Sequence, residues 1–306
     1  MTSPRIALVT GANQGLGLAL AQGLAARLRP QDDVVLLTGR DAVRVADAVA
    51  TLGQDGAQVE GRVLDVRDEG AIAALAHELR RDHGGVDIVF SNAGARISPD
   101  QQPADAIDEL VETSNLGTTR MLRAFTPIVR PGGRMIVVAS SFGRLGHLDP
   151  SVRPRFERAS TLEDVEAVLA DWRAAVHAGR AESEGWPTWI NIPSKVAQVA
   201  AVRAVAAARR ERDLADGTLI AAVCPGLIDT DASRPWFDDM SAAQTPARAA
   251  EALLDLALAP TADARFYGEL VRSGRVLSWR DEIAPTSSAG ALVSRSAGVA
   301  QPARNS

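Results

Sequence analysis

The sequence has one cysteine, no long apolar run and no cluster of basic residues, and each of these absences excludes a class of protein. A single cysteine, Cys224, cannot form a disulfide framework within the chain. No apolar segment approaches the roughly 20 residues of a membrane-spanning helix, and the opening residues, MTSPRIALVT, lack the features of a secretory signal. With 33 Lys and Arg against 38 Asp and Glu, a net charge of -5 argues against a nucleic-acid partner. We therefore expect a cytoplasmic protein that binds a small molecule, with neither a membrane nor a nucleic acid as partner.

The apolar residues that are present, 46% of 306, are enough to build one large core. They gather in short runs that lie between longer segments with helical periodicity. Runs without polar alternation are typical of strands buried on both faces of a sheet. The runs lie at residues 6–9, 34–37, 86–90, 135–139 and 219–223. We therefore predict a single-domain α/β fold, a Rossmann-type, doubly wound parallel sheet with helices on both faces.

Two segments interrupt this alternation of strands and helices. The first contains an apolar stripe at helical spacing, which a capping-box pattern, Thr161-x-x-Asp164, precedes. The stripe consists of Leu162, Val165, Leu169, Trp172 and Val176. The second segment, residues 285–306, is rich in Ser, Ala and Gly and has no amphipathic period. We predict one domain over residues 1–284 with a helical insertion at about 148–187, followed by a mobile tail over 285–306.

A glycine-rich loop, TGANQGLG at residues 10–17, directly follows the first predicted strand. Gly11 permits a tight turn, Gly15 leaves room for a pyrophosphate, and Gly17 lets the next helix approach the strand. Backbone N–H groups and the positive end of that helix would then face phosphate oxygens. The loop also contains Asn13, Gln14 and Leu16. A glycine-rich turn that binds no ligand is the alternative.

Arg40 follows the second predicted strand, where a dinucleotide-binding fold selects its cofactor. An acidic residue there would hold both ribose hydroxyls, whereas a guanidinium offers a fork of donors to a 2′-phosphate. The sequence therefore favours NADP(H) as the cofactor. The alternative is that Arg40 only caps the next helix in solvent.

Together with these motifs, residues 5–279 resemble the short-chain dehydrogenase/reductase family, and most closely its monomeric carbonyl-reductase branch. Three more motifs carry the resemblance: SNAG at residues 91–94, PGxxxT at residues 225–230, and EGWP at residues 184–187. The resemblance implies further nucleotide contacts from Asp65 and Val66 at the adenine, from Asn92, Ala93 and Gly94, and from Pro225, Gly226, Ile228 and Thr230 beside the nicotinamide. The alternative role for Asp65 is a helix N-cap.

The same resemblance implies hydride transfer between the nicotinamide and a carbonyl carbon, while a tyrosine exchanges the proton at the carbonyl oxygen. Ser141 would orient that oxygen, Lys195 would also hold the nicotinamide ribose, and Asn115 would anchor a water relay. The tyrosine is absent, because Asn191 stands four residues before the lysine. Tyr267, the only tyrosine of the chain, lies in FYGEL, a segment that resembles a terminal strand.

Asn191 removes an acid from the expected site, because a carboxamide does not titrate where a phenol can. General acid catalysis contributes about 10²–10⁴ in rate, so its loss would slow hydride transfer without abolishing it. In one interpretation the chain is an enzyme, an NADPH-dependent reductase of apolar or aromatic ketones and aldehydes. Its proton would come from Lys195, or from a water held by Ser141, Asn191 and Lys195. We favour this interpretation because Ser141 and Lys195 are both retained.

Two other interpretations stay open. The chain could be a weak or inactive NADP(H)-binding protein, or Asn191 could be an engineered replacement of tyrosine in a carbonyl reductase.

Five other side chains have both a functional and a structural interpretation. His147 could supply the missing acid, although a loop histidine is more often solvated. His177 is expected at the surface, near the end of the inserted helix. Trp186 and Trp189 could line an apolar pocket or brace the insertion. Trp236 follows the PG turn, where this family carries its substrate lid, and core packing is the alternative.

We also predict a monomer. Many members of the resembled family pair through the lysine helix and the helix before it, and the inserted helix has an apolar face able to cover that surface. The predicted partner is a small carbonyl compound, and no metal site is expected.

Overall fold

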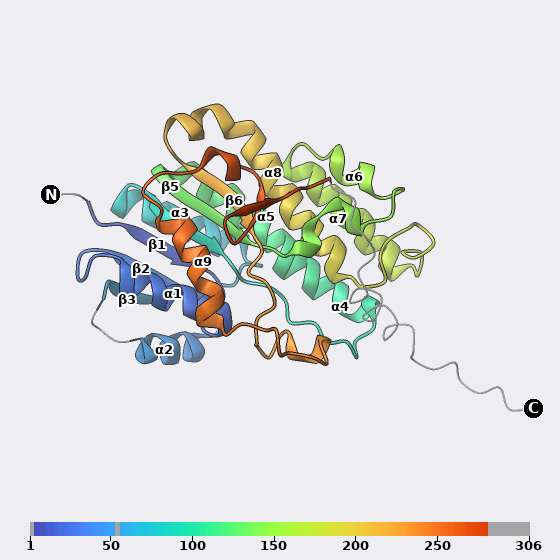
Figure 1. Cartoon of the computed structure of the whole chain (residues 1–306), viewed down its shortest axis with the longest axis horizontal. Coiled ribbons are helices and arrows are strands. Elements are labelled where there is room, and N and C mark those ends of the chain that lie inside the picture. The colour runs from blue at the N-terminus through green and yellow to red at the C-terminus, as the bar shows by residue number, and fades with distance from the viewer. Residues whose placement is uncertain (1–2, 53–55, 281–306) are drawn as a thin grey trace, which may run out of the picture.

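The computed structural model describes residues 3–52 and 56–280 (Figure 1). Its centre is an eight-stranded sheet with the order β3-β2-β1-β4-β5-β6-β7-β8. All neighbouring strands pair in parallel except β8, which is antiparallel to β7. The strands are β1 (Ile6–Val9), β2 (Val34–Gly39), β3 (Gln58–Val63), β4 (Val86–Ser91), β5 (Val129–Val138), β6 (Leu219–Val223), β7 (Leu270–Arg272) and β8 (Arg275–Leu277). The predicted doubly wound sheet is confirmed.

Helices cover both faces of this sheet, and β1 shows why its sequence lacks polar alternation. Ile6 and Leu8 point into one core, whereas Ala7 and Val9 point into the other, so neither face of the strand meets water. The first core is covered by α3 (Glu69–His83), α4 (Pro103–Leu110), α5 (Gly117–Phe125) and α8 (Asn191–Ala215). The second core is covered by α1 (Gly15–Arg27), α2 (Ala42–Thr51) and α9 (Pro246–Leu258).

All five apolar runs are strands, and β7 begins at the last residue of FYGEL, the segment that resembled a terminal strand, whereas β3 and β8 were not predicted. β3 lies at the edge of the sheet, and its sequence QVEGRV mixes polar and apolar residues because the strand is largely open to solvent. β7 and β8 have three residues each, too few for a pattern. Tyr267 lies just before β7, where its hydroxyl donates a hydrogen bond to Asp213 Oδ2 at 2.7 Å.

The predicted insertion contains α6 (Arg153–Glu157) and α7 (Leu162–His177). The capping box of Thr161 and Asp164 opens α7, and its whole apolar stripe is buried. α7 packs against α4, α6 and α8. Asp108 of α4 accepts hydrogen bonds from Arg173 Nε at 2.6 Å and from His177 Nε2 at 2.7 Å. His177 is therefore a contact between helices, in addition to lying in the last turn of α7 as predicted.

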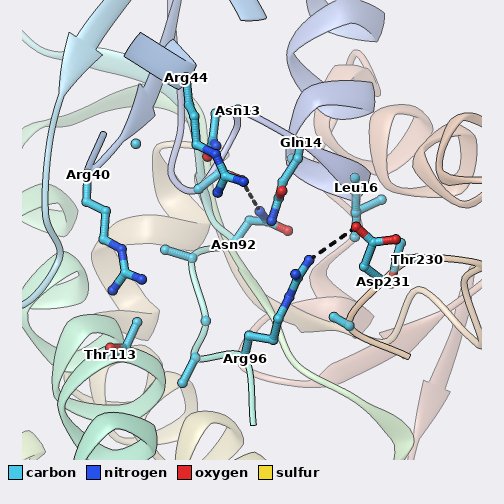
Figure 2. A pocket seen from close by; sticks show the side chains of 18 of the residues that line it. Asn13, Gln14, Leu16, Arg40, Arg44, Asn92, Arg96, Thr113, Thr230 and Asp231 are labelled. Carbon is cyan, nitrogen blue, oxygen red and sulfur yellow. Dashed lines mark hydrogen bonds and ion pairs between the residues drawn. The ribbon is translucent and has the colours of Figure 1, made fainter. Parts of the chain in front are cut away.

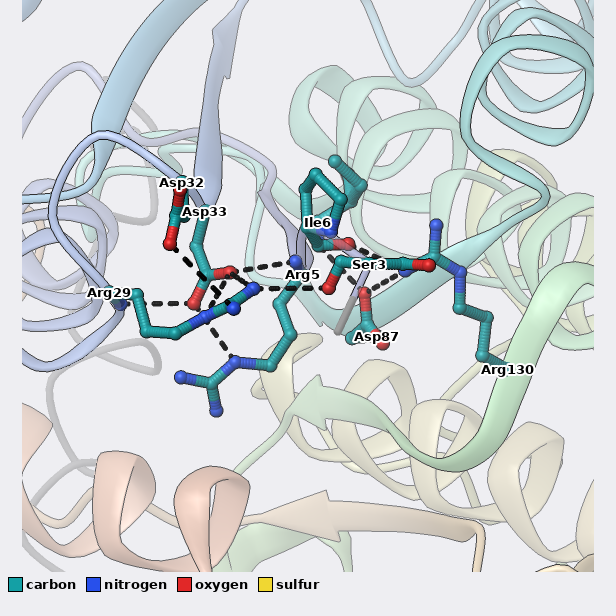
Figure 3. Close-up of polar contacts among 9 residues, drawn as sticks. Ser3, Arg5, Ile6, Arg29, Asp32, Asp33, Asp87 and Arg130 are labelled. Atoms are coloured by element: carbon teal, nitrogen blue, oxygen red, sulfur yellow. Dashed lines mark hydrogen bonds and ion pairs between the residues drawn. The ribbon is translucent and has the colours of Figure 1, made fainter. Parts of the chain in front are cut away.

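Two carboxylates join the ends of several elements at the amino edge of the sheet (Figure 3). The Asp33 side chain is fully buried and accepts hydrogen bonds from backbone and side-chain nitrogens of Arg5 and Arg29 at 2.6–3.1 Å. Burial opposes its charged form, but these donors outweigh burial and hold the pKa of Asp33 well below its usual range. Asp87 accepts from the backbone N–H of Ile6 at 2.7 Å and from Arg130 at 2.8 Å. This edge is a polar anchor for the sheet.

In residues 3–52 and 56–280, no helix combines the length and apolarity that crossing a membrane requires. The tail predicted to be mobile, residues 285–306, lies outside the described residues.

Candidate active site

The loops that follow β1, β2, β3, β4 and β6 meet at the carboxyl edge of the sheet and line a cavity of about 680 Å³ (Figure 2). Ligands of doubly wound folds bind at this edge. Most residues predicted to bind the nucleotide line the cavity: Gly11, Asn13, Gln14, Gly15, Leu16, Gly17, Arg40, Asp65, Val66, Asn92, Ala93, Gly94, Ile228 and Thr230. Three other predicted cofactor contacts, Lys195, Pro225 and Gly226, do not line it.

The glycine-rich loop owes its shape to close backbone contacts. Gly11 has a φ of +60°, and a Cβ there would lie 2.9 Å from Cα of Ala93. A Cβ at Gly17 would lie 2.3 Å from the carbonyl oxygen of Gly11. At Gly15, with φ +56°, the nearest atom would be Thr230 Cγ2 at 3.6 Å, so space remains on the cavity side. The loop therefore offers an open cradle at the N-terminus of α1, which suits a phosphate group.

Asn92 fastens the SNAG turn to this loop. Its side-chain amide donates to the carbonyl oxygens of Thr10 at 2.9 Å and Gly11 at 3.2 Å. The Thr10 hydroxyl in turn accepts from the backbone N–H groups of Asn92 at 2.9 Å and Ala93 at 3.0 Å. The two loops thus form one rigid wall of the cavity.

Two arginines stand one helical turn apart at the end of β2 and the start of α2. Arg40 is 59% exposed and forms an ion pair with Glu109 at 3.6 Å. Arg44 lines the same cavity and was not predicted, although its i, i+4 spacing from Arg40 was visible in the sequence. The cap of α2 is Asp41, which accepts from the backbone N–H of Arg44 at 3.0 Å. Capping therefore does not occupy the Arg40 side chain, and both guanidinium groups can face a ligand.

Asp65 lies at the far end of this cavity but is engaged with a neighbour. Hydrogen bonds from the Arg67 side chain, at 2.6–3.1 Å, lower the pKa of its carboxyl. The N-cap of α3 is Asp68, so the capping alternative for Asp65 is wrong. Val66 is buried, and a Cβ at Gly117 would come within 2.8 Å of it, which places the first residue of α5 directly behind this wall.

The loop after β6 closes the cavity opposite the SNAG turn. Gly226 has a φ of +85°, a left-handed conformation that favours glycine. Farther along, Asp231 forms an ion pair with Arg96 at 3.6 Å, which spans the cavity between the loops after β6 and β4 (Figure 2). Neither Arg96 nor Asp231 was predicted, and no sequence spacing relates the two.

The predicted catalytic residues lie on three elements that pack against one another. Ser141 begins a 3₁₀ turn after β5, Asn191 begins α8, and Lys195 follows one turn later. A Cβ at Gly143 would lie 2.9 Å from the carbonyl oxygen of Lys195, so the serine turn and α8 are in close contact. Asn115 lies in a π-helix (Val111–Leu116) between α4 and α5. π-Helical turns are frequent at functional sites.

Several polar groups in this region lack protein partners. Asn115 Nδ2 donates to the carbonyl oxygen of Ser194 at 2.8 Å, but its Oδ1 is buried without a partner, as is Ser194 Oγ. In the part of the chain that the structure describes, the Ser141 hydroxyl and the Asn191 carboxamide also make no hydrogen bond. Buried polar groups are normally satisfied, so a site with several free ones is suited to a polar ligand or bound water.

Lys195 is held by a residue that was not predicted. Its Nζ donates to Gln198 Oε1 at 2.8 Å. Burial lowers the pKa of Lys195 to about 8, which the nearby Cys224 opposes. The amine is therefore close to its titration point near neutral pH.

His147 and Tyr267 do not replace the missing tyrosine. His147 Nε2 lies 3.2 Å from the carbonyl oxygen of Ser141, and burial, together with Arg144, lowers the pKa of the ring. A neutral imidazole that already donates to a carbonyl is a poor acid. Tyr267 is paired with Asp213 in the last part of α8, and burial and that carboxylate raise the pKa of its phenol.

Aromatic side chains stack beside the serine turn. Phe142 packs edge-to-face on Trp189, with ring centroids 4.8 Å apart, and Trp189 lies 5.6 Å from Trp236. The indole N–H of Trp236 donates to the carbonyl oxygen of Ile97 at 3.3 Å. Trp186 instead contacts Phe156 and Trp172 inside the insertion. The two tryptophans therefore have different places: Trp186 of EGWP braces the insertion, and Trp189 borders the active-site segment.

Residues 5–150 match the profile of a family described as short chain dehydrogenase. A curated protein of Mus musculus named carbonyl reductase (NADPH) 3 is 33% identical and aligns with 90% of this chain and 98% of its own length. Carbonyl reductase (NADPH) 1 of Homo sapiens is 32% identical with the same coverage of both chains.

Two solved structures share the fold. Salutaridine reductase from Papaver somniferum superposes with a TM-score of 0.73 at 21% identity, covering 87% of this chain and 99% of its own. Menthone neomenthol reductase from Mentha piperita gives a TM-score of 0.71 at 24% identity, covering 90% and 100%. At these identities the similarity supports the architecture alone.

Proposed function

The chain belongs to the short-chain dehydrogenase family, and on that premise we propose that it is an NADPH-dependent reductase of apolar or aromatic ketones and aldehydes. One observation carries the proposal. The cavity at the carboxyl edge joins an open glycine cradle to two arginines, and the elements that carry Ser141, Asn191 and Lys195 pack together at the same end of the fold. That the curated relatives are named NADPH carbonyl reductases supports the cofactor and the reaction class.

The residues present fit NADP(H). The loop of Gly11, Asn13, Gln14, Gly15, Leu16 and Gly17 would hold the pyrophosphate at the start of α1. Arg40 and Arg44 would bind the 2′-phosphate, since guanidinium groups suit phosphate geometry. Asp65 and Val66 would border the adenine, with Asn92, Ala93 and Gly94 along the middle of the nucleotide. Pro225, Gly226, Ile228 and Thr230 would lie on the nicotinamide side, and Lys195 would hold its ribose.

Bound NADPH supplies a hydride, and the protein must place a carbonyl and protonate its oxygen. The Ser141 hydroxyl and the Asn191 amide are free to donate hydrogen bonds to that oxygen. Asn115, through its bond to the Ser194 carbonyl oxygen, holds the first turn of α8, which carries Asn191 and Lys195, against the π-helix. Phe142, Trp189 and Trp236 form an apolar border for the substrate. In this arrangement Asn191 orients the oxygen but supplies no proton.

The proposal is tested with the purified full-length chain. Titration with NADPH and NADH by fluorescence or calorimetry should give tighter binding of NADPH, and a panel of aryl ketones and aldehydes should cause slow oxidation of NADPH. Failure to bind either nucleotide would contradict every nucleotide-dependent function for this chain. Equal affinity for both would contradict only the assigned role of the arginines.

One observation favours a second candidate, a nucleotide-binding protein with weak or no turnover. The residues that line the main cavity do not include Ser141, Asn191 or Lys195, and the stacked rings of Trp189 and Trp236 lie at that end. Tight NADPH binding without oxidation by any carbonyl compound is the result that this candidate requires. An engineered origin of Asn191 is compatible with either candidate.

We further propose a cytoplasmic monomer whose domain spans residues 1–284. The insertion at about 148–187 supports the monomer, because α7 packs on α4 and α8 and buries its own apolar stripe there. Light scattering should give the mass of one chain, and a stable tetramer would contradict this assignment.

A further inference from the structure

Lys195 is the only lysine of the chain, and the other 32 of its 33 Lys and Arg residues are arginines. Arginine stays protonated under all ordinary conditions, whereas a lysine amine can release its proton when burial lowers its pKa. The one side-chain amine of this protein therefore lies at the site that lacks its expected acid.

Gln198, one turn further along α8, fixes the position of this amine. Its Nε2 donates to the carbonyl oxygen of Ser114 and to the hydroxyl of Thr118, both at 3.0 Å. Because both acceptors require the amide nitrogen, Oε1 is the atom that faces Lys195, where it accepts from Nζ at 2.8 Å. Rotating the amide would place its N–H groups against the ammonium and leave the Ser114 carbonyl with fewer donors. Gln198 is buried, so this orientation is protected from water.

Burial, and not a nearby charged side chain, has the largest effect on the pKa of Lys195. No carboxylate of the described residues forms an ion pair with it, and its hydrogen-bond acceptor is Gln198. The π-helix, α5, the serine turn, α6, α7 and β5 all pack on α8, yet burial and Cys224 are the causes that shift the pKa of the amine. Cys224, the residue directly after β6, favours the charged form of the amine, against the larger effect of burial. A neutral amide oxygen is thus the main partner of the ammonium, and it stabilises the proton less than a carboxylate would.

We propose that Lys195 is the proton donor of the reduction and that Gln198 is the residue that positions it. This inference rests on the proposed function. A hydride from the dihydronicotinamide forms the new C–H bond, and the carbonyl π electrons pass to oxygen. That oxygen takes a proton from Lys195 Nζ, and the neutral amine then regains a proton from water. The products are an alcohol and NADP⁺, and no further oxidant or reductant is needed.

Because the chain has one lysine, the amine can be observed by itself. Protein labelled with ¹³C-lysine gives one side-chain signal, and its titration reports the Lys195 pKa without cofactor or turnover. We expect a midpoint near 8. Gln198→Glu should raise this midpoint by about one unit or more, since it sets a carboxylate against the ammonium. Gln198→Met, which keeps the length of the side chain, should lower it. Glu211→Gln, an exposed charge change elsewhere on α8, is the control and should leave it unchanged.

The same variants are then assayed for kcat/KM with NADPH and an aryl ketone from pH 6 to 10. The rate should fall as pH rises through the NMR midpoint, because only the ammonium can donate a proton. This falling part of the pH–rate profile, the alkaline limb, should move with the midpoint in each Gln198 variant. Lys195→Arg should lose the limb and about 10²-fold or more in rate. If the Gln198 variants do not fold, agreement between the NMR midpoint and the limb in the unmodified chain remains decisive.

The outcomes separate this inference from the function on which it rests. If NADPH binds and no carbonyl compound is reduced at any pH, both proposals are wrong. If reduction occurs but its rate ignores the Lys195 midpoint, the reductase stands and Lys195 is not the donor, and the proton then comes from a bound water.

Discussion

The two edges of the sheet differ in how far their buried polar groups are satisfied, although Arg134 Nε at the amino edge is also buried without a partner. At the amino edge, the fully buried carboxylate of Asp33 accepts five hydrogen bonds from Arg5 and Arg29. At the carboxyl edge, among the residues that the structure describes, Asn115 Oδ1, Thr113 Oγ1 and Ser194 Oγ are buried without partners. Both edges belong to the same strands, so the difference does not arise from the architecture.

The difference indicates what each edge is for. An unsatisfied buried polar atom costs about 1–3 kcal/mol, so a protein retains several together only where a ligand or water completes them. Satisfied charge at the amino edge contributes stability, and unsatisfied groups at the carboxyl edge provide a binding surface. Substitutions at the carboxyl edge should therefore alter activity, whereas those at the amino edge should alter stability.

The largest expected effect is that of Asn191→Tyr on turnover. A phenol placed next to Lys195 should change the rate of carbonyl reduction by a factor of about 10²–10⁴, the usual contribution of a general acid. The rate should rise if the phenol can donate its proton there, and fall if it displaces what Asn191 holds. Steady-state kinetics with NADPH measure the change, and denaturation of the same variant should show little loss of stability. An unaltered rate would remove this position from the chemistry.

Asp33→Asn should have the complementary effect. Arg5 and Arg29 are 41% and 35% exposed, so water can hydrate them once the carboxylate is gone, and the expected loss is that of hydrogen bonds to a charged group, about 1.5–3 kcal/mol. Chemical denaturation should show this loss, while NADPH affinity stays the same. Asp82→Asn, which breaks an exposed pair with Arg81, is the matched control and should have almost no effect. A comparable loss in both variants would mean that burial is not the cause.

The same carboxylate predicts a pH dependence of stability. The pKa of Asp33 in the folded state lies below the value of about 3.9 expected in the unfolded chain. Its contribution is therefore complete at neutral pH and is lost progressively as pH falls below about 4. The unmodified chain should lose stability over that interval, and Asp33→Asn should lose less. Parallel pH profiles for the two proteins would exclude Asp33 as the source.

Arg40→Ala and Arg44→Ala should have smaller effects at the carboxyl edge. Each removes charged hydrogen bonds to the 2′-phosphate, so NADPH affinity should fall by about 10- to 100-fold with NADH affinity unchanged. Calorimetry with both nucleotides checks this. Loss of affinity for both nucleotides would show that the arginines support the loop rather than select the phosphate.

The smallest effect is expected for Arg96→Gln. Its ion pair with Asp231 is more than half exposed on both sides, so stability should change by about 0.5 kcal/mol or less. Denaturation curves that overlay within error would meet this expectation. A large change would show that the cavity walls depend on this pair. It would also contradict the expectation that substitutions at the carboxyl edge alter activity and not stability.

The sequence predicted the elements whose residue pattern directly reflects their burial or a contact close in sequence. The apolar runs became strands because both faces of the sheet are covered, and Thr161 and Asp164 marked the start of α7 because capping is a local interaction. β3 was missed because an edge strand carries a mixed pattern.

At the site, the loop residues from Gly11 to Gly17 were predicted because all of them lie in one short turn, so that their spacing in the sequence is characteristic. Gln198 was missed because its role depends on which way its amide points, and that is decided by Ser114 and Thr118 across α5 and the π-helix. Arg44 was missed although its spacing from Arg40 was readable. The ion pair of Arg96 and Asp231 was missed because the two loops that carry these residues meet only in the folded protein.

The π-helix between α4 and α5 makes the number of residues in this segment important for the site. α4, the π-helix and α5 follow one another without a break from Pro103 to Phe125. A regular α-helix advances by about 100° per residue, so a wide turn that absorbs an extra residue sets the rotational phase between the two halves. Deleting one residue there would replace this wide turn by a regular α-helical one and shift Asn115 relative to the Ser194 carbonyl oxygen to which it donates. The segment that carries Asn115 should therefore tolerate changes of side chain far better than changes of length.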